Sequence, residues 1–330
     1  MVIFTFTILL LIFVVLNRIL NSRFKHWEYV VVPPSIFILF VIIVLLILNL
    51  FVDGNPLIAL IALVIYFESL DLGTNLHKRI TKSHSDEKLK IIDLNTLYFG
   101  PNIEQSLADF LQSKDADIII LQELFSNKDR INFPSKGFIR KASFDHFLPQ
   151  PFVHQFFPSY PYMVMIQDKG VLSKTPITII KEHISKIHAF GYLIASTTFN
   201  GVEIIIINVH MPRIFKNNIF FEDRKRLFNL LYEDIKYYKS INKNLILTGD
   251  FNATKASRFI QKLFKLLNES ITENRFGFIS TWHTDLPLWR LDYLFYNRSK
   301  KFYLSNSHVF DSNDFSDHMG LEVNFIVKNS

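Results

Sequence analysis

The segment 247–254 places two polar side chains at the end of an apolar run. It reads LTGDFNAT and follows NLI, so that Asp250 and Asn252 stand two positions apart, directly after a glycine. In an extended chain the side chains of residues i and i+2 point the same way. A carboxylate and a carboxamide on one face could bind a metal ion and a phosphate group, and a solvated turn is the alternative interpretation.

Other strand-like runs in the chain also end in residues that can bind a metal ion or a phosphate. Three of these runs end in Asn95, Glu123 and His210, and Asp317 and His318 stand just before the last one. A single polar residue at a strand end is most often part of a turn. Seven such residues of these types favour a shared site over coincidence.

The segments that must position these residues lie between residues 88 and 328. Apolar runs predict strands, and Asn200-Gly201 between two of them predicts a hairpin. The periodicity of 221–240 and 259–267 predicts helices. Because most of the expected pairing is antiparallel and helices are interspersed, we expect an α+β sandwich and not a doubly wound parallel sheet. Strands are expected over 88–95, 116–123, 190–199, 202–210 and 244–252, and around LDYLFYN, KFYLSNSHVF and GLEVNFIV.

Three apolar stretches precede this domain. Residues 1–16 and 30–52 carry no charge, and a helix over 30–52 would be about 35 Å long, which is enough to cross a bilayer. The third stretch, 56–67, is short and has no polar face. We expect a transmembrane region over 1–70 with two or three helices at about 1–20, 30–52 and 55–70, a polar linker over 71–87 and a folded domain over 88–330.

The positions of basic residues favour three membrane spans over two. One cluster lies before the second stretch and another follows the third: Arg18, Arg23 and Lys25, then Lys78, Arg79 and Lys82. Three spans put both clusters on one side, which the positive-inside rule assigns to the cytoplasm. We therefore expect a multi-pass integral membrane protein with a cytoplasmic C-terminal domain. Two spans would put the clusters on opposite sides.

Composition excludes some kinds of site. The chain has no cysteine, so it has no disulfide, no thiolate nucleophile and no cysteine-ligated metal. The domain also lacks the glycine-rich phosphate loops GxGxxG and GxxxxGK[ST]. A net charge of +6 suits an anionic partner or an anionic membrane surface without selecting either.

The order of these motifs resembles the endonuclease/exonuclease/phosphatase superfamily. That superfamily includes pancreatic-type deoxyribonuclease, abasic-site endonucleases, neutral sphingomyelinases and inositol-polyphosphate phosphatases. The resemblance covers about residues 88–328, and the membrane-anchored bacterial members are the most similar overall. The motifs that carry it are KIIDLN ending at Asn95, LQE ending at Glu123, GVLSKTPI, NVH ending at His210, GDFN, RLDY with Asp292, and SDH ending at His318.

The resemblance implies a fold and a metal site. It implies a two-sheet β-sandwich flanked by helices, in four layers α/β/β/α, with residues 88–330 as the catalytic domain. It also implies hydrolysis of phosphate esters with Mg²⁺, for which Mn²⁺ could substitute. Glu123 would be the principal metal ligand, and Asn95 would offer its carboxamide oxygen directly or through water. Asp317 would join the metal shell or orient the nucleophile.

The resemblance further implies roles for five residues at the reacting phosphate. Asp250 would orient or deprotonate the attacking water, and Asn252 would donate a hydrogen bond to a phosphate oxygen. His318 would face the scissile phosphate with Asp292 bound to its ring, acting as a base, an acid or a cation. His210 matches the second histidine of the branch that contains deoxyribonucleases and sphingomyelinases.

We therefore expect a membrane-anchored phosphodiesterase or nuclease. A lipid or inositol-phosphate hydrolase of the sphingomyelinase kind is the alternative, and an inactive membrane-tethered binding module is a third possibility. The expected partners are a nucleic acid or phospholipid substrate and the membrane. Weaker candidates for phosphate contact or base stacking are Arg213, Arg290, Trp282, Trp289 and Tyr160.

Overall fold

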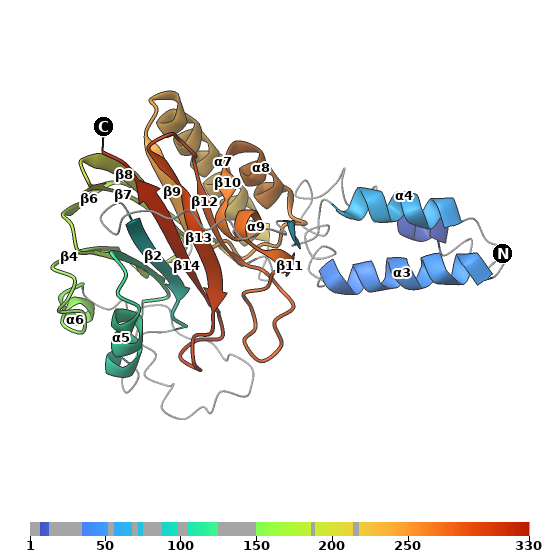
Figure 1. Cartoon of the computed structure of the whole chain (residues 1–330), viewed down its shortest axis with the longest axis horizontal. Coiled ribbons are helices and arrows are strands. Elements are labelled where there is room, and N and C mark those ends of the chain that lie inside the picture. Colours follow the sequence, from blue (N-terminus) through green and yellow to red (C-terminus); the bar gives the residue numbers. More distant parts are fainter. Residues whose placement is uncertain are drawn as a thin grey trace.

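The structure is a computed structural model of the whole chain (Figure 1). It describes residues 7–12, 35–51, 56–67, 72–74, 88–97, 104–124, 150–185, 189–213 and 218–329. Most of these residues form two six-stranded sheets covered by helices.

The first sheet has the strand order β13-β14-β2-β3-β5-β4. Its centre is apolar, because β3 has the sequence IIILQ and every one of its residues is buried. Continuous apolar runs of this kind are typical of strands that are covered on both faces. The strands are β2 (Lys88–Asn95), β3 (Ile118–Gln122), β4 (Tyr162–Ile166), β5 (Lys169–Ser173), β13 (Phe302–Phe310) and β14 (Gly320–Val327).

The second sheet has the order β10-β12-β9-β8-β7-β6. The predicted hairpin is confirmed: β7 and β8 pair in antiparallel register on either side of Asn200 and Gly201, which both have positive φ. The strands are β6 (Ile177–Ile184), β7 (Gly191–Phe199), β8 (Val202–His210), β9 (Asn244–Asp250), β10 (Asn268–Glu269) and β12 (Asp292–Tyr296).

Three apolar cores separate four layers, which confirms the predicted sandwich. One core lies between the sheets, where Ile120 and Ile206 are both fully buried. A second packs the first sheet against α5 (Glu104–Ser113) and α6 (Gln150–His154). The third packs the other sheet against α7 (Asn218–Ser240) and α8 (Arg258–Leu266), and α9 (Ser270–Asn274) lies next to β13.

Strand direction brings the polar strand ends together. Most neighbours are antiparallel, but β2 and β3 are parallel, and so are β8 and β9. Parallel strands end at the same edge, so Asn95 lies opposite Gln122, and His210 lies opposite Asp250. The antiparallel strand β12 begins at that edge, with Asp292 opposite Asp250.

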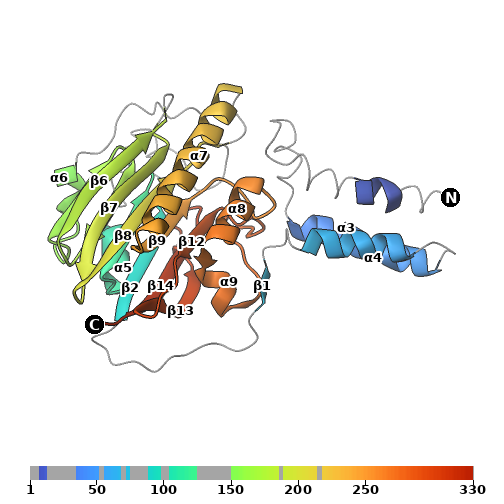
Figure 2. The same ribbon diagram turned by 90° about the horizontal axis from the view of Figure 1, so that it is seen from above.

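The N-terminal region contains two apolar helices that pack side by side in both views (Figures 1 and 2). They are α3 (Ser35–Phe51) and α4 (Pro56–Phe67), within the predicted segments 30–52 and 55–70. In the predicted segment 1–20 the structure describes only residues 7–12, which are helical. No helix among the described residues is both long enough and apolar enough to cross a membrane. The prediction of transmembrane helices is therefore not confirmed.

The predicted linker contains a strand. Residues Leu72–Thr74 form β1, which pairs in antiparallel register with β11 (Phe276–Phe278) of the sandwich domain. The strand β1 also packs against α9. Residues 75–87 of the predicted linker lie outside the described residues.

Candidate active site

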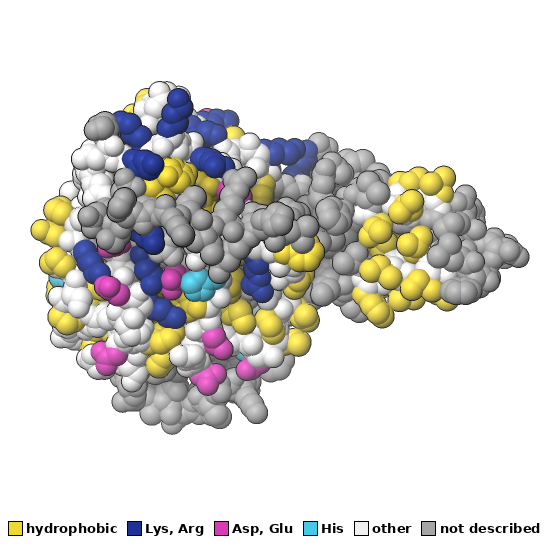
Figure 3. Space-filling model, viewed as in Figure 1, with side chains coloured by type: hydrophobic (Ala, Val, Ile, Leu, Met, Phe, Trp, Pro, Cys, Tyr) yellow, Lys and Arg dark blue, Asp and Glu magenta, His cyan; other side chains and the backbone are white. Residues whose placement is uncertain are grey.

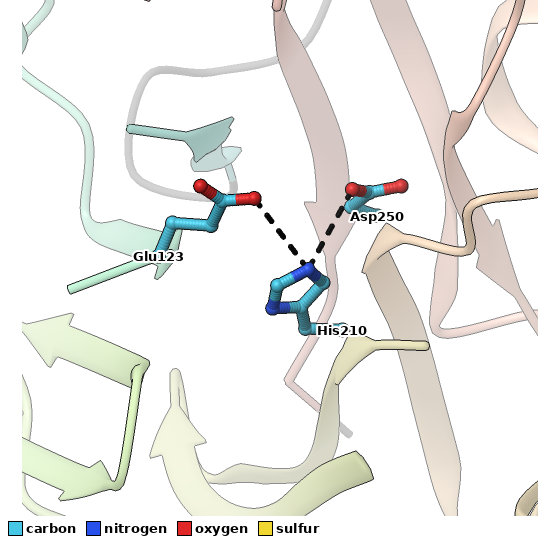
Figure 4. A group of neighbouring side chains, drawn as sticks. All are labelled: Glu123, His210 and Asp250. Carbon is cyan, nitrogen blue, oxygen red and sulfur yellow. Dashed lines mark ion pairs between the residues drawn. The ribbon is translucent and has the colours of Figure 1, made fainter. Parts of the chain in front are cut away.

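The polar strand ends meet at one edge of the sandwich, and the residues predicted at these strand ends lie there. Figure 4 shows Glu123 from the first sheet facing His210 and Asp250 from the second. The Nε2 atom of His210 lies 3.6 Å from Oε1 of Glu123 and 3.8 Å from Oδ2 of Asp250. Each of the three residues is at most 2% exposed.

The strand predicted over 116–123 is shorter in the structure, where β3 ends at Gln122. Glu123 therefore stands just past the strand. Its φ of 59° turns the chain out of the sheet, a conformation that side chains with a Cβ adopt rarely. Asn95 connects Glu123 to the second sheet, since its Nδ2 donates to Oε1 of Glu123 at 3.2 Å and to Oδ2 of Asp250 at 3.1 Å. The carboxamide oxygen of Asn95 instead accepts from the backbone N–H of Leu97 at 3.0 Å. A metal-ligand role for that oxygen stays a prediction.

Strand β9 ends at Asp250, two residues short of the predicted 244–252, and Asn252 has a φ of 47°. The two residues therefore lie in a turn and not in an extended segment, although Asp250 is fully buried. Oδ1 of Asp250 accepts from the backbone N–H of Asn252 at 2.7 Å, and Oδ2 accepts from Nδ2 of Asn252 at 3.0 Å. Burial raises the pKa of Asp250 and nearby Asp292 adds to the rise, while His318, His210 and Arg213 oppose it. A raised pKa makes this carboxylate a stronger base at neutral pH.

His210 is oriented by a buried pair of charges that the sequence reasoning missed. Its Nδ1 donates to Oδ2 of Asp168 at 2.5 Å, and Oδ1 of Asp168 lies 2.6 Å from Nζ of Lys169. Burial alone would raise the pKa of Asp168, but Lys169 and His210 lower it. Asp168 and Lys169 directly precede the GVLS motif, in a segment QDKG that reads as an ordinary turn. Only the neighbouring motif could have drawn attention to them.

His318 has a simpler arrangement. Its Nδ1 donates to Oδ2 of Asp292 at 2.9 Å, as the resemblance predicted, and its Nε2 lies 4.0 Å from Oδ2 of Asp250 and 3.9 Å from Oδ1 of Asp317. Burial lowers the pKa of His318, but the carboxylates of Asp292, Asp317 and Asp250 outweigh it and raise the pKa to about 10. The imidazole is therefore a cation at neutral pH.

The weaker candidates divide into two groups. Trp282 lies at the site, where its Nε1 donates to Oδ2 of Asp317 at 3.0 Å, and its ring is 5.4 Å from that of Trp289. Arg213 also reaches the site, with Nη2 3.1 Å from Oε1 of Glu123. The other two are structural, which corrects the prediction. Tyr160 is buried and donates to the backbone oxygen of Ala116, and Arg290 is buried against Glu269 at 2.6 Å.

A polar network beneath the site connects the two sheets. Nε2 of Gln122 donates to Oδ1 of Asp93 and to Oδ1 of Asn208, both at 2.9 Å. Asn208 in turn donates to the backbone oxygens of Leu121 and Gly170. Burial raises the pKa of Asp93 well above its ordinary value, and the carboxylate of Asp292 raises it further. The network fixes the strand ends that carry Glu123 and His210.

Comparison with known proteins shows the family. The model of the Endonuclease/Exonuclease/phosphatase family matches residues 95–318, more than half of the chain and the whole interval from Asn95 to His318. The chain belongs to this family. Membership identifies it as a phosphoester-hydrolysing enzyme and confirms the superfamily that the motif order indicated. A search of the curated proteins found no match.

Solved structures with a similar fold support the architecture. One is D. rerio TDP2 complexed with a single-strand DNA product, with 17% identity, a TM-score of 0.52, and coverage of 74% of this chain and 100% of that one. A second is an endonuclease/exonuclease/phosphatase from Beutenbergia cavernae, with 13% identity, a TM-score of 0.53, and coverage of 74% and 72%. A family protein from Bacteroides thetaiotaomicron has 15% identity, a TM-score of 0.52, and coverage of 74% and 99%. At these identities the likeness shows the fold alone.

The site fits a divalent cation. Glu123, His210 and Asp250 form one group that could hold a metal ion, and Asp250, Asp292 and His318 form another. Several buried atoms at the site have no hydrogen-bond partner among the described residues: Oδ1 of Asp292, Oδ1 of Asp317 and Nε2 of His210. Carboxylate oxygens are the ligands that Mg²⁺ prefers. Four carboxyl groups facing Arg213 and a protonated His318 leave an excess of negative charge, which a divalent ion would balance.

Proposed function

We propose that this enzyme is a Mg²⁺-dependent phosphodiesterase, with nucleic acid as its most favoured substrate class. The observation that carries the proposal is the position of Oδ2 of Asp250. This atom lies 3.8 Å from Nε2 of His210 and 4.0 Å from Nε2 of His318, and Asp250 belongs to both candidate metal groups. A base between two histidines and a metal ion is an arrangement suited to water attack on a phosphate ester.

Each residue contributes by position and charge, as phosphoryl transfer requires. Glu123 would hold Mg²⁺, and the bound ion would neutralise charge on the phosphate oxygens. Asp250 would orient the attacking water and accept its proton. Asn252 would donate to a phosphate oxygen in exchange for one of its present acceptors, Oδ2 of Asp250 or the backbone oxygen of Met211.

The two histidines would both face the reacting phosphate. The cationic His318, oriented by Asp292, would stabilise the negative charge that develops at the phosphate or on the leaving oxygen. His210 presents Nε2 toward the same space, and Asp168 fixes its ring orientation. Removal of Asp168 would therefore misorient His210 without taking a carboxylate from either candidate metal group.

The substrate ranking rests on a fold likeness and on a surface. D. rerio TDP2, whose structure contains a single-strand DNA product, has the same fold, and this supports nucleic acid. A lipid or inositol-phosphate diester is the second candidate, because the α3–α4 hairpin exposes a band of apolar side chains (Figure 3). These side chains are Phe40, Ile43, Ile47, Leu48, Leu57, Leu60 and Ile61.

The apolar surface of the hairpin also supports membrane association. Contiguous exposed apolar side chains of this kind are unusual in a protein that has no lipid or protein partner. We propose that the N-terminal region anchors the enzyme to a membrane and that the catalytic domain faces the cytoplasm. A reporter fused at residue 85 that is exported would contradict this sidedness, and full extraction of the enzyme from membranes by alkaline carbonate would contradict the anchoring.

A substrate screen with the purified full-length protein tests the function. Plasmid DNA, single-stranded DNA, RNA, and vesicles of sphingomyelin or phosphoinositides would each be incubated with Mg²⁺ or with EDTA. We expect cleavage of nucleic acid with Mg²⁺ only, and a loss in kcat of about 10²- to 10⁴-fold for Glu123→Gln, Asp250→Asn and His318→Ala.

The control variant is Lys236→Gln. Lys236 is an exposed residue of α7 that pairs with Glu233 outside the site. It is expected to retain full activity. Metal-dependent cleavage of lipid vesicles but not of nucleic acid would select the second substrate class. Absence of hydrolysis with every substrate would favour an inactive binding module.

A further inference from the structure

Arg213 reaches from the surface into a buried group of carboxylates. Its Nη2 lies 3.1 Å from Oε1 of Glu123, and its side chain is 34% exposed, compared with 3% for that of Glu123. Arg213 therefore lies at the boundary between solvent and the carboxylates proposed to perform the reaction.

The backbone that leads to Arg213 is fixed by the site itself. The N–H of Met211 donates to the backbone oxygen of Asp250 at 2.9 Å, and the backbone oxygen of Met211 accepts from Nδ2 of Asn252 at 3.0 Å. The backbone oxygen of Pro212 accepts from Nη1 of the buried Arg224. With its backbone anchored and a third of its side chain in solvent, Arg213 can turn its guanidinium outward while the strand ends stay in place.

The atom that Arg213 contacts belongs to a group that could hold a metal ion. Oε1 of Glu123 also accepts from Asn95 and faces His210, and these contacts position the carboxylate between the two sheets. A divalent cation bound to Glu123 would lie next to a positive guanidinium, and like charges at such short range repel. The guanidinium would then pair more favourably with another anion. A phosphate group matches its planar set of donors better than any single carboxylate oxygen does.

We propose that Arg213 exchanges partners during the catalytic cycle. It pairs with Glu123 while the metal site is empty, and it pairs with the substrate phosphate once the metal ion is bound. In the first state it competes with the metal ion, and in the second it contributes to substrate binding. This inference rests on the proposed function, because it assigns Arg213 a place in that same site.

Calorimetric titration of the purified full-length protein separates the two effects. MgCl₂ alone would be titrated first, and inorganic phosphate would then be titrated in the presence of saturating Mg²⁺. We expect Arg213→Gln to bind Mg²⁺ about tenfold more tightly and phosphate about tenfold more weakly than the wild type. The opposite signs are diagnostic, because damage to the fold would weaken both.

Arg226 provides a matched control. It forms a similar pair outside the site, with Nη2 2.7 Å from Oδ1 of Asp223 and exposures of 36% and 6%. Arg226→Gln is expected to change neither Kd. Arg213→Lys keeps the charge without the planar set of donors, so it should bind Mg²⁺ as the wild type does and phosphate more weakly.

Two results would overturn the inference. The first is an Mg²⁺ affinity of Arg213→Gln that is equal to or weaker than that of the wild type. The second is a phosphate affinity of Arg213→Gln that equals that of the wild type. Both apply when the wild-type protein is active. A wild-type protein that neither binds Mg²⁺ nor hydrolyses a phosphodiester would contradict the proposed function itself, and this inference with it.

Discussion

At the scale of single residues, the two site histidines differ in what supports their carboxylates. Asp168, which orients His210, is itself paired with the fully buried Lys169, whose ammonium group also donates to the backbone oxygen of Ala189. Asp292 orients His318 through Oδ2, and its other oxygen, Oδ1, has no hydrogen-bond partner among the described residues. The His210 pair is therefore a closed structural unit, and the His318 pair is open to the reacting group.

Removal of the buried cation should damage both stability and activity. Lys169→Met leaves the buried Asp168 without its ammonium partner and with His210 alone, and breaking a buried ion pair costs about 3–5 kcal/mol. We expect that loss in the free energy of unfolding, and a fall in kcat of about tenfold or more in the protein that remains folded, since His210 loses its fixed orientation. Lys236→Met, which breaks an exposed pair with Glu233, should change stability by at most about 1 kcal/mol. Equal effects of the two substitutions in chemical denaturation would contradict this role for Lys169.

The His318 cation gives the metal-free protein a pH-dependent stability. Because the folded protein raises the pKa of His318 to about 10 from an ordinary value of 6.5, the folded state binds this proton more tightly than the unfolded state does. The stabilisation is complete below pH 6.5, declines as pH rises, and is lost once the pH passes about 10. In EDTA, the difference in Tm between the wild type and His318→Gln should therefore be largest near pH 6 and shrink toward pH 10. A difference that grows with pH would show that the site does not favour the cation.

At the scale of elements, α7 joins two loops of the site. Arg224 is fully buried near the start of this helix, where it stacks on Phe228 with 5.1 Å from its guanidinium carbon to the ring centre. Its donors reach the backbone oxygens of Pro212 and Asn252, which each stand two residues after the end of β8 or β9. The helix thereby sets the distance between the His210 end and the Asp250 end of the site.

Loss of this connection should misplace the site. We expect Arg224→Met to lower the free energy of unfolding by about 3 kcal/mol, because two buried carbonyl groups lose a charged donor. We also expect kcat/KM to fall by about 10²-fold, since a displacement on the order of 1 Å is enough for such a loss. Lys225→Met, at the exposed neighbouring position, is the control and should change neither quantity. Wild-type kcat/KM in a stable Arg224→Met protein would show that the loops hold their positions alone.

At the scale of the whole molecule, the pairing of β1 with β11 attaches the N-terminal helices to the catalytic domain. The strand β11 is followed closely by Thr281 and Trp282, and the latter contacts Asp317. Oγ1 of Thr281 accepts from the backbone N–H of Asp292 at 3.1 Å. The attachment of the N-terminal region is therefore only a few residues from one wall of the site.

Truncation should reveal the contribution of β1. A chain that begins at residue 71 retains β1, and one that begins at residue 88 exposes the edge of β11. We expect the shorter chain to be less stable by about 1 kcal/mol, or about 2–4 °C in Tm, and to exchange the amide hydrogens of 276–278 faster. Identical exchange in the two chains would mean that β11 holds its conformation without β1. Both chains lack α3 and α4, so the comparison isolates the segment 71–87, which contains β1.

The sequence by itself determined the elements and the identity of most site residues. Alternating apolar runs and turn signals such as Asn200-Gly201 act over a few residues, so strands, hairpin and outer helices follow from local pattern. The polar ends at Asn95, Glu123 and Asp250 were equally visible, because an apolar strand that ends in a metal-binding type of residue is a local feature. The order of the motifs was sufficient to indicate the family.

Only the tertiary structure decided which polar side chains face the site and which support the core. Arg290 and Tyr160 are buried against Glu269 and the backbone of Ala116, whereas Asp168 and Lys169, in an unremarkable turn, orient His210. Likewise, a short segment of the predicted linker became β1 because a partner strand two hundred residues later lies beside it. Residue type sets what a side chain can bind, but its direction depends on strand register and on partners far away in the chain, which no local pattern contains.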